Sequence, residues 1–164
     1  MDLYQLEFDG GLLARGFWLY VWKISVSDGR TLYYVGKTGD KASGASQSPF
    51  DRVSKHLGHN ENNNALRRHL GKNGIDPESC RFSFRACGPI FAHVSTAKHG
   101  ELCDITSGLE KALADAMATA GYTVINRVHC RKPMDVKLFV RVRAAFAAHF
   151  PALAGRTPTP GRMR

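Results

Sequence analysis

The chain has 164 residues, of which 43% are hydrophobic, so it can bury the core of one domain but is short for two independent ones. Lysine and arginine number 23 against 14 acidic residues, and the formal net charge of +9 favours a polyanionic partner such as nucleic acid. The composition is that of a folded globule rather than a disordered chain, and no apolar run approaches membrane-spanning length, so no membrane partner is expected.

Four cysteines lack the dense spacing of a disulfide framework: Cys80, Cys87, Cys103 and Cys130. The N-terminal residues also lack the pattern of a secretory signal, so we expect a reduced, cytoplasmic protein. A zinc site is the alternative use of these thiols. It lacks a Cys-x-x-Cys or His-x-x-x-His core around its candidate ligands, which are His93, His99, Cys103, His129 and Cys130.

The first predicted structure is a β-hairpin. Residues 17–25 and 31–35 are rich in aromatic and β-branched side chains, and the intervening Ser27-Asp28-Gly29-Arg30 has turn chemistry, with Gly29 free to adopt a positive φ. Alternation places one set of side chains on a common face of the first strand: Trp18, Tyr20, Trp22 and Ile24. Tyr20 therefore fits a core position, and a buried tyrosine can still present its hydroxyl at the edge of a cleft.

A helix is predicted over residues 49–57, after a loop rich in glycine, serine and lysine. Ser48 is a typical N-cap residue, and Pro49 suits the first helical position. Arg52 and His56 lie four residues apart in this helix and share a face.

A second short helix is predicted over residues 65–72. Asn64 is its expected cap, and Asn73-Gly74 ends it. One face of this helix carries three cations, which are Arg67, Arg68 and Lys72.

The remaining elements follow from periodicity. Residues 79–86 alternate apolar with polar side chains and predict a third strand with a basic outer face. Residues 88–104 lack a clear period and are interpreted as a connecting segment with room for one short element. Residues 107–120 have the apolar stripe of a helix, and residues 122–125 predict a strand. Residues 134–150 predict a last helix, whose stripe is Val136, Phe139, Val140, Arg143, Phe146, Ala147 and Phe150.

These elements predict an α/β (α+β) fold in residues 1–150. Its sheet would be small, mixed or antiparallel, built on the N-terminal hairpin and flanked by helices. Residues 151–164 are rich in proline and arginine and predict a flexible basic tail.

The order of Trp18-Leu19-Tyr20, Tyr34-Val35-Gly36, Arg52 and His56 resembles the catalytic core of GIY-YIG endonucleases. Two departures are visible, because Trp18 replaces the usual first glycine and the loop after the second strand is lengthened. The resemblance covers about residues 17–126. It implies a GIY-YIG-like fold and a metal-dependent endonuclease that hydrolyses DNA phosphodiester bonds.

The resemblance also implies roles for individual side chains. Tyr34 would be the general base and Tyr20 its partner, although the two roles are interchangeable at this stage. Lys37 would lower the tyrosine pKa through its charge. Arg52 would contact the scissile phosphate, and His56 would hydrogen-bond either that phosphate or a tyrosine hydroxyl.

Two later positions complete the implied site. Glu110 would hold a Mg²⁺ ion (or Mn²⁺), since one carboxylate with several waters is normal for magnesium held against a substrate phosphate. Its alternative role is structural, because Ser107-x-x-Glu110 is also a good capping box at the start of the predicted helix. Asn126 would support the site, and an ordinary strand-end residue is the equally weighted alternative.

The expected partner is DNA, with RNA as the alternative substrate, and the protein would act as a monomer or homodimer. The cations assigned to nucleic-acid binding are Lys37, Arg52, Lys55, Arg67, Arg68 and Lys72. Three alternatives to a DNA endonuclease remain: a non-catalytic binding module with the same fold, a nuclease toxin or RNA-cleaving variant, and an interaction protein whose last helix docks a partner.

Overall fold

The computed structural model describes residues 1–39, 46–59, 64–94 and 96–155, and its strands form a three-stranded antiparallel sheet in the order β2-β1-β3. The strands are β1 (Gly16–Ser25), β2 (Thr31–Lys37) and β3 (Arg81–Ala92). The helices are α1 (Pro49–Leu57), α2 (Ala65–Lys72), α3 (Thr96–Thr119) and α4 (Val136–Ala147). The predicted α+β class, with a small antiparallel sheet on an N-terminal hairpin, is therefore confirmed.

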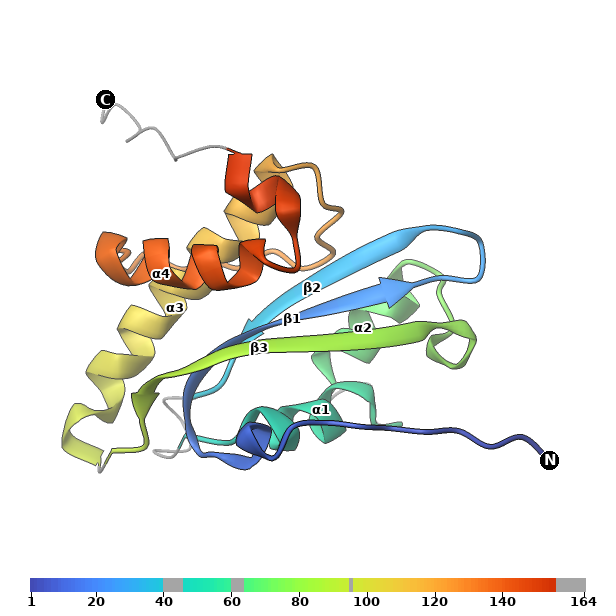
Figure 1. Ribbon diagram of the computed structural model, residues 1–164, viewed down its shortest axis with the longest axis horizontal. Helices are drawn as coiled ribbons and strands as arrows, with labels where there is room; N and C mark the ends of the chain where they lie inside the picture. The colour runs from blue at the N-terminus through green and yellow to red at the C-terminus, as the bar shows by residue number, and fades with distance from the viewer. Residues whose placement is uncertain (40–45, 60–63, 95, 156–164) are drawn as a thin grey trace.

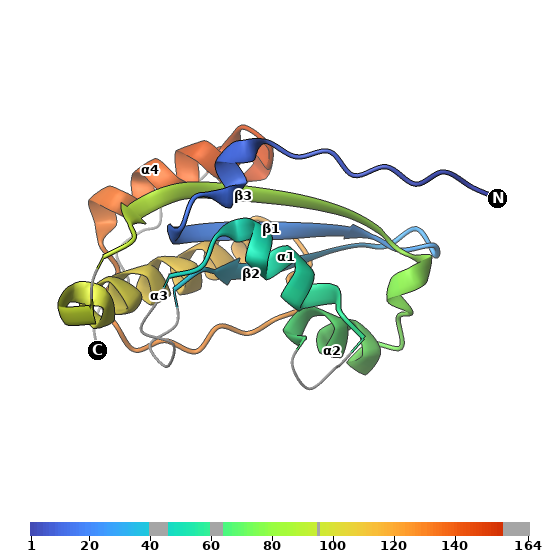
Figure 2. The same cartoon turned by 90° about the horizontal axis from the view of Figure 1, so that it is seen from below.

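Helices cover both faces of the sheet. In Figure 2, α1 and α2 lie on one face and α4 lies on the other, while Figure 1 shows β1 in the middle of the sheet. Helix α3 contacts β1 and β2 and packs beside α4. Among the described residues, none of the helices is long and apolar enough to cross a membrane.

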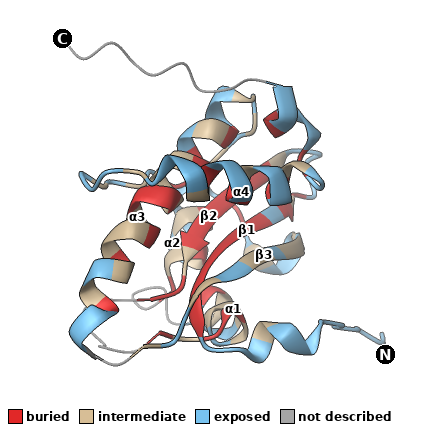
Figure 3. Ribbon diagram, turned by 60° about the vertical axis from the view of Figure 1, so that its left-hand side comes forward, coloured by how far each residue is buried: buried red, intermediate tan, exposed pale blue. Residues whose placement is uncertain are grey.

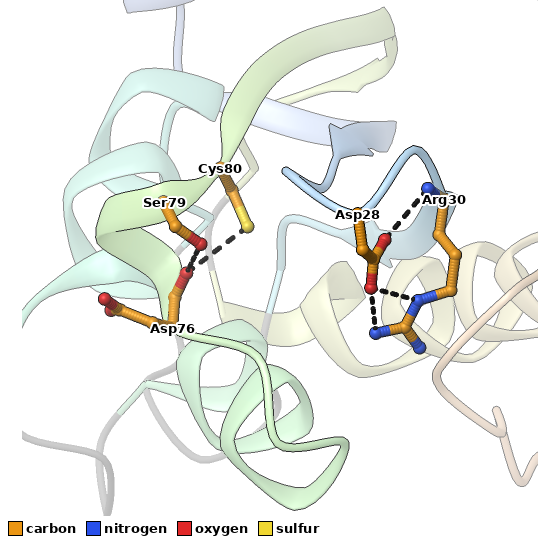
Figure 4. A network of polar contacts seen from close by, with 5 residues as sticks. All are labelled: Asp28, Arg30, Asp76, Ser79 and Cys80. Carbon is orange, nitrogen blue, oxygen red and sulfur yellow. Dashed lines mark hydrogen bonds and ion pairs between the residues drawn. The ribbon is translucent and has the colours of Figure 1, made fainter.

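The hairpin turn forms as its sequence predicts. Gly29 adopts a φ of +88°, which an L side chain would resist. The Asp28 carboxylate accepts hydrogen bonds from the backbone N–H of Arg30 at 3.0 Å and from its Nε at 2.7 Å (Figure 4). Beside this turn in Figure 4, the Asp76 carbonyl accepts a hydrogen bond from Ser79 Oγ at 2.8 Å. Polar contacts between residues close in sequence thus stabilise this end of the sheet.

The central strand β1 is buried on both sides, as the red ribbon in Figure 3 shows, and therefore separates two cores. The core toward α1 and α2 contains Tyr20, Trp22, Ile24, Leu32, Tyr34, Leu66 and Leu70. The core toward α3 and α4 contains Leu19, Val21, Tyr33, Val35, Leu109, Leu113, Met117, Phe139 and Phe146. Tyr20, Trp22 and Ile24 accordingly share one face, as alternation predicts. Trp18, predicted on the same face, lies outside this core at a register shift between β1 and β3.

The prediction that residues 88–104 form a connecting segment is wrong. Strand β3 continues to Ala92, and α3 begins at Thr96. β3 is an edge strand, so it tolerates Pro89, which lacks a backbone N–H. The Trp18 ring packs against Gly88, where a Cβ atom would lie only 2.8 Å from the ring. Trp18, which stands where the GIY-YIG pattern has a glycine, therefore packs against β3 where the register between β1 and β3 shifts.

The early start of α3 also removes the capping-box alternative for Glu110. Ser107 lies inside the helix, where its hydroxyl donates to the Cys103 carbonyl at 2.7 Å. The Glu110 carboxylate therefore has no helix N-terminus to cap at this position.

The strand predicted for residues 122–125 is reduced to a single bridge between Val124 and Tyr33 of β2. Tyr33 donates to the Thr123 carbonyl at 2.9 Å, and Ile125 donates to the Tyr33 carbonyl at 2.8 Å. Further backbone pairing stops because the Asn126 side chain occupies the next position on β2.

The last helix and the tail differ from their predicted limits. Asp135 caps α4 by accepting from the Leu138 backbone N–H at 3.0 Å, so the helix begins at Val136 rather than near residue 134. Val136 and Val140, predicted in the packed stripe, are 62% and 59% exposed. Phe139, Phe146 and Phe150 of the predicted stripe are buried, and Val142, which was not predicted, is buried with them.

Residues Pro151–Gly155, assigned to the flexible tail, form a 3₁₀ helix. Leu153 in this helix is buried, and its carbonyl accepts a hydrogen bond from Arg143 Nε at 2.8 Å. This contact also explains the arginine in the predicted apolar stripe. The rest of the tail lies outside the described residues.

Candidate active site

The two candidate tyrosines lie on adjacent strands and face the same side of the sheet. Tyr20 of β1 pairs with Gly36 of β2, and Trp22 pairs with Tyr34. Because Gly36 has no side chain, the Tyr20 ring lies directly over it, and a Cβ atom at this position would come within 2.4 Å of the ring. The hairpin register thus brings Tyr20 and Tyr34 together over a glycine.

His56 of α1 completes an aromatic cluster with these tyrosines. Its Nε2 lies 2.6 Å from the Tyr20 hydroxyl, and its ring centre is 5.3 Å from that of Tyr34. Burial, reinforced by the charge of Arg52, lowers the pKa of His56 to about 4. The imidazole is therefore neutral at pH 7.

Helix α1 presents His56 because its first turn is firmly capped. The Ser48 hydroxyl accepts from the Asp51 backbone N–H at 3.1 Å, and the Asp51 carboxylate accepts from the Ser48 backbone N–H at 3.0 Å. This reciprocal capping box, with Pro49 at the first turn, fixes the start of the helix as the sequence predicts.

Arg52 lies one turn before His56, and its charge acts on every ionisable side chain of the cluster. It lowers the pKa of Tyr20, Tyr34 and Glu110 as well as that of His56. Its Nε is buried and has no hydrogen-bond partner among the described residues. A buried guanidinium N–H without a partner is costly, so this group is suited to receive an anionic ligand.

Glu110 brings a carboxylate from α3 to the same cluster. Burial raises its pKa to about 7, against the opposing charges of Lys37 and Arg52. The Glu110 charge in turn raises the pKa of both Tyr20 and Tyr34. A half-buried carboxylate beside two phenols and an arginine is consistent with a site that binds a cation and an anion together.

Both tyrosine hydroxyls are protonated at neutral pH in this structure. Burial is the main cause, and it raises the pKa of Tyr34 to about 12 and that of Tyr20 well above its ordinary value. The Tyr34 hydroxyl has no hydrogen-bond partner among the described residues, whereas the Tyr20 hydroxyl is engaged with His56. A base role would therefore fall more readily to Tyr34, and only with added positive charge nearby.

Lys37 lies at the end of β2 and acts at a different point from the one the resemblance implies. Its charge lowers the pKa of Glu110, whereas the cations that lower the pKa of Tyr34 are Arg52 and Arg68. Its Nζ donates to the Gly39 carbonyl. Lys37 is therefore part of the charge environment of the carboxylate.

The side chain of Asn126 is hydrogen-bonded to the backbone of β2. Its Oδ1 accepts from the Val35 backbone N–H at 3.0 Å, and its Nδ2 donates to the Val35 carbonyl at 2.7 Å. The side chain is buried, so it is more than an ordinary strand-end residue. These two bonds hold the backbone of β2 in place next to Tyr34.

The remaining predicted DNA-binding cations are spread along α1 and α2. Arg68 is close enough to act on Tyr34, while Arg67 donates through Nε to the Leu57 carbonyl at 3.3 Å. Lys55 and Lys72 are exposed. Sequence reasoning overlooked His69, whose ring centre is 5.8 Å from that of Tyr34, and its position beside Arg68 is the signal that could have indicated it.

The donor set limits how a divalent ion could be held. Within the described ranges, no three histidine, cysteine, aspartate or glutamate side chains are grouped as metal ligands. Glu110 alone would therefore have to anchor Mg²⁺, with waters and substrate oxygens as the other ligands. Magnesium tolerates that arrangement because it keeps several waters and binds through one or two carboxylates plus phosphates.

Comparison with known proteins finds no matching family model, no matching curated protein and no matching solved structure. The function must therefore be argued from the residues and geometry of the site itself.

Substitution of Gly36 tests how the hairpin positions Tyr20. Gly36→Ala should displace the tyrosine ring from His56 and destabilise the fold by about 2 kcal/mol, because the new methyl group would overlap the ring. Gly100→Ala is the control, since Gly100 lies in α3 with open space around it, and alanine should leave stability unchanged or slightly raised there. Urea unfolding of both variants makes the comparison, and equal stability would contradict the close approach.

The pH dependence of stability should contain two opposing contributions. The folded pKa of His56 is about 4 against an ordinary 6.5, so its contribution is present above pH 6.5 and is lost as pH falls toward 4. The folded pKa of Glu110 is about 7 against an ordinary 4.5, so stability falls as pH rises from 4.5 to 7. The two contributions offset each other between these limits in the wild type.

Substituting one of these two residues should therefore reveal the pH dependence of stability that the other residue contributes. Between pH 4.5 and 6.5, Glu110→Gln should gain stability with rising pH relative to the wild type, by about 1 kcal/mol per pH unit, and His56→Gln should lose it at a similar rate. Denaturant unfolding of metal-free protein at several pH values measures both slopes. Identical slopes in the three proteins would show that neither pKa is displaced by folding.

Proposed function

We propose that this protein is a metal-dependent endonuclease that hydrolyses DNA phosphodiester bonds at the Tyr20–Tyr34–Arg52–His56–Glu110 cluster. The observation that carries the proposal is the convergence of a sheet, α1 and α3 on one group of electrostatically coupled side chains. The resemblance of residues 17–126 to GIY-YIG endonucleases supports it from the sequence.

The side chains supply complementary parts of phosphodiester hydrolysis. Arg52, with its unpartnered Nε, would bind a non-bridging phosphate oxygen and stabilise the charge that grows there. Tyr34 would orient the attacking water. It would accept a proton from that water as the phenolate, which forms once the charges of Arg52 and a bound divalent ion lower the pKa of its hydroxyl. His56 holds Tyr20 by a hydrogen bond and thereby fixes the neighbouring ring.

Glu110 would hold the divalent ion. When bound, such an ion neutralises charge on the phosphate and lowers the pKa of groups around it. Glu110 would bind the ion as a carboxylate, and it is ionised more fully as pH rises above about 7. Cutting should accordingly be faster at pH 8 than at pH 6.

The net charge of +9 supports a nucleic-acid substrate. Lys55, Arg68 and Lys72 lie on the two helices that cover the tyrosine face, so a phosphate backbone bound near Arg52 would also meet these cations. We place DNA before RNA as the substrate, on the strength of the sequence resemblance.

A cleavage assay with purified protein tests the proposal. Supercoiled DNA should be nicked or linearised with Mg²⁺ or Mn²⁺, the new ends should carry a 5′-phosphate and a 3′-hydroxyl, and EDTA should stop the reaction. A matched RNA strand in parallel shows which nucleic acid is preferred. Cutting that continues unchanged in EDTA, or that leaves other ends, would contradict the proposed chemistry.

A binding module without catalysis is the second candidate, and the high tyrosine pKa values favour it. A tyrosine whose pKa is raised to about 12 is almost entirely protonated at neutral pH, so it cannot act as a base unless a nearby cation lowers that pKa. This candidate predicts salt-sensitive DNA binding with no metal-dependent cutting under any of these conditions.

A further inference from the structure

A second cationic site lies on the face of the sheet opposite the tyrosine cluster. It is a pocket of about 250 Å³, several times the ~30 Å³ of one water molecule. Its lining consists of Lys23, Ser25, Arg81, Phe82, Ser83, Arg85, His149 and Phe150. Because successive side chains of β1 alternate, Lys23 and Ser25 point away from the side occupied by Tyr20, Trp22 and Ile24.

The strand register concentrates positive charge in this pocket. Lys23 of β1 pairs directly with Ser83 of β3, so Arg81 and Arg85 are its two diagonal neighbours on the same face. Neighbouring like charges on a sheet are destabilising. Three cations in this arrangement gain stability when an anion binds between them.

No carboxylate of the described residues neutralises these cations. The pocket lining contains no aspartate or glutamate, and none of the ion pairs in the described part of the chain involves Lys23, Arg81 or Arg85. Arg85 makes one hydrogen bond, from a terminal guanidinium nitrogen to the Phe84 carbonyl at 3.0 Å, and its other donors are available.

The donors of the pocket suit the chemistry of a phosphate group. Arginine and lysine supply charge-assisted N–H donors. Ser83 lies opposite Lys23 and Ser25 lies opposite Arg81 in the register, and the hydroxyls of these serines can donate as well. Phe150, which is buried, and His149, which is exposed, also line the pocket. The lining therefore offers many donors and no competing anion.

We propose that this pocket binds a phosphate group, supplied either by a second segment of nucleic-acid backbone or by a free phosphorylated small molecule. The site is separate from the tyrosine cluster, so it does not depend on whether the protein cuts DNA. Backbone binding here would let one molecule hold nucleic acid on both faces of its sheet.

Binding of inorganic phosphate tests the site directly. Titration into ¹⁵N-labelled wild type at low salt should give saturable shifts of the amides around residues 23–25 and 81–85. Arg81→Gln/Arg85→Gln should weaken this binding at least about tenfold. The matched control is Lys98→Gln/Lys137→Gln, which removes the same charge from exposed positions on α3 and α4 and should leave the titration unchanged.

A DNA-binding titration of the same proteins without metal separates the two sources of phosphate. If nucleic acid is the source, the pocket variant should bind DNA more weakly than wild type, and the control variant should lose less affinity. In the pocket variant, the slope of the logarithm of the binding constant against the logarithm of the salt concentration should decrease in magnitude by about 2. Equal DNA affinity in both variants, with phosphate binding lost only in the pocket variant, identifies a free phosphorylated molecule. Phosphate shifts that never saturate, or that are equally weakened by both variants, would overturn the site.

Discussion

Glu110→Gln is expected to reduce metal-dependent DNA cutting at least about 1000-fold, because it removes the carboxylate that would anchor the divalent ion while keeping nearly the same shape. DNA affinity should stay within about twofold of wild type, since the cationic side chains are unchanged. Rates are measured under single-turnover conditions with protein in excess, and affinity is measured separately in EDTA.

Asp115→Asn is the matched control for this substitution. Asp115 lies on the same helix, is exposed and pairs with Lys111, so its loss changes the net charge equally without touching the cluster. Control and wild type should cut alike. If Glu110→Gln also cuts at the wild-type rate, Glu110 does not hold the metal.

Tyr34→Phe is expected to slow cutting by about 100-fold to 10⁴-fold, because it removes the hydroxyl best placed to act as base and keeps the ring that packs the core. Tyr20→Phe should reduce the rate less, since that hydroxyl already bonds His56 and acts by positioning. It should cost about 1–2 kcal/mol of stability, because the buried His56 Nε2 loses its partner. Cleavage rates and urea unfolding of both variants separate chemistry from positioning.

Tyr33→Phe controls for the loss of a phenol. Tyr33 directly precedes Tyr34 on β2, but its ring packs on the opposite face against Tyr122 and Phe150. This variant should cut like wild type. An equal rate loss in Tyr33→Phe and Tyr34→Phe would point to a general effect on the sheet.

Much of the fold could be predicted because local signals agreed with tertiary packing. The hairpin had turn residues between two β-rich runs, and α1 had a serine cap followed by proline. Helix α1 has its predicted limits, whereas the hairpin strands were predicted over residues 17–25 and 31–35 and span Gly16–Ser25 and Thr31–Lys37. The hairpin and α1 carry Tyr20, Tyr34, Arg52 and His56, so most of the candidate site could be located from the sequence.

The errors arose where long-range contacts decide the local structure. Residues 88–104 contain a glycine and a proline that suggest a loop, yet pairing with β1 extends β3 through them. Val136 and Val140 fit a helical stripe, but the contacts of α4 leave them exposed. A single sequence cannot show which of two helix faces meets the sheet.

The pKa values of the site residues also could not be predicted from the sequence. Burial, rather than neighbouring charge, dominates the pKa values of Tyr34, His56 and Glu110, and burial depends on how α1 and α3 close over the hairpin. The same holds for Lys37: the resemblance to GIY-YIG endonucleases implied that its charge acts on a tyrosine, whereas it lowers the pKa of Glu110.

The most direct test of the central claim is single-turnover DNA cleavage by wild type, Tyr34→Phe, Glu110→Gln and the double variant, with all DNA bound. If these residues form one metal-dependent site, each single substitution should reduce the rate by at least about 100-fold. The double variant should be about as slow as the slower single variant, because residues that act as a unit are not additive. Wild-type cutting rates in both single variants, with cleavage still dependent on Mg²⁺, would show that the catalytic site lies elsewhere in the protein.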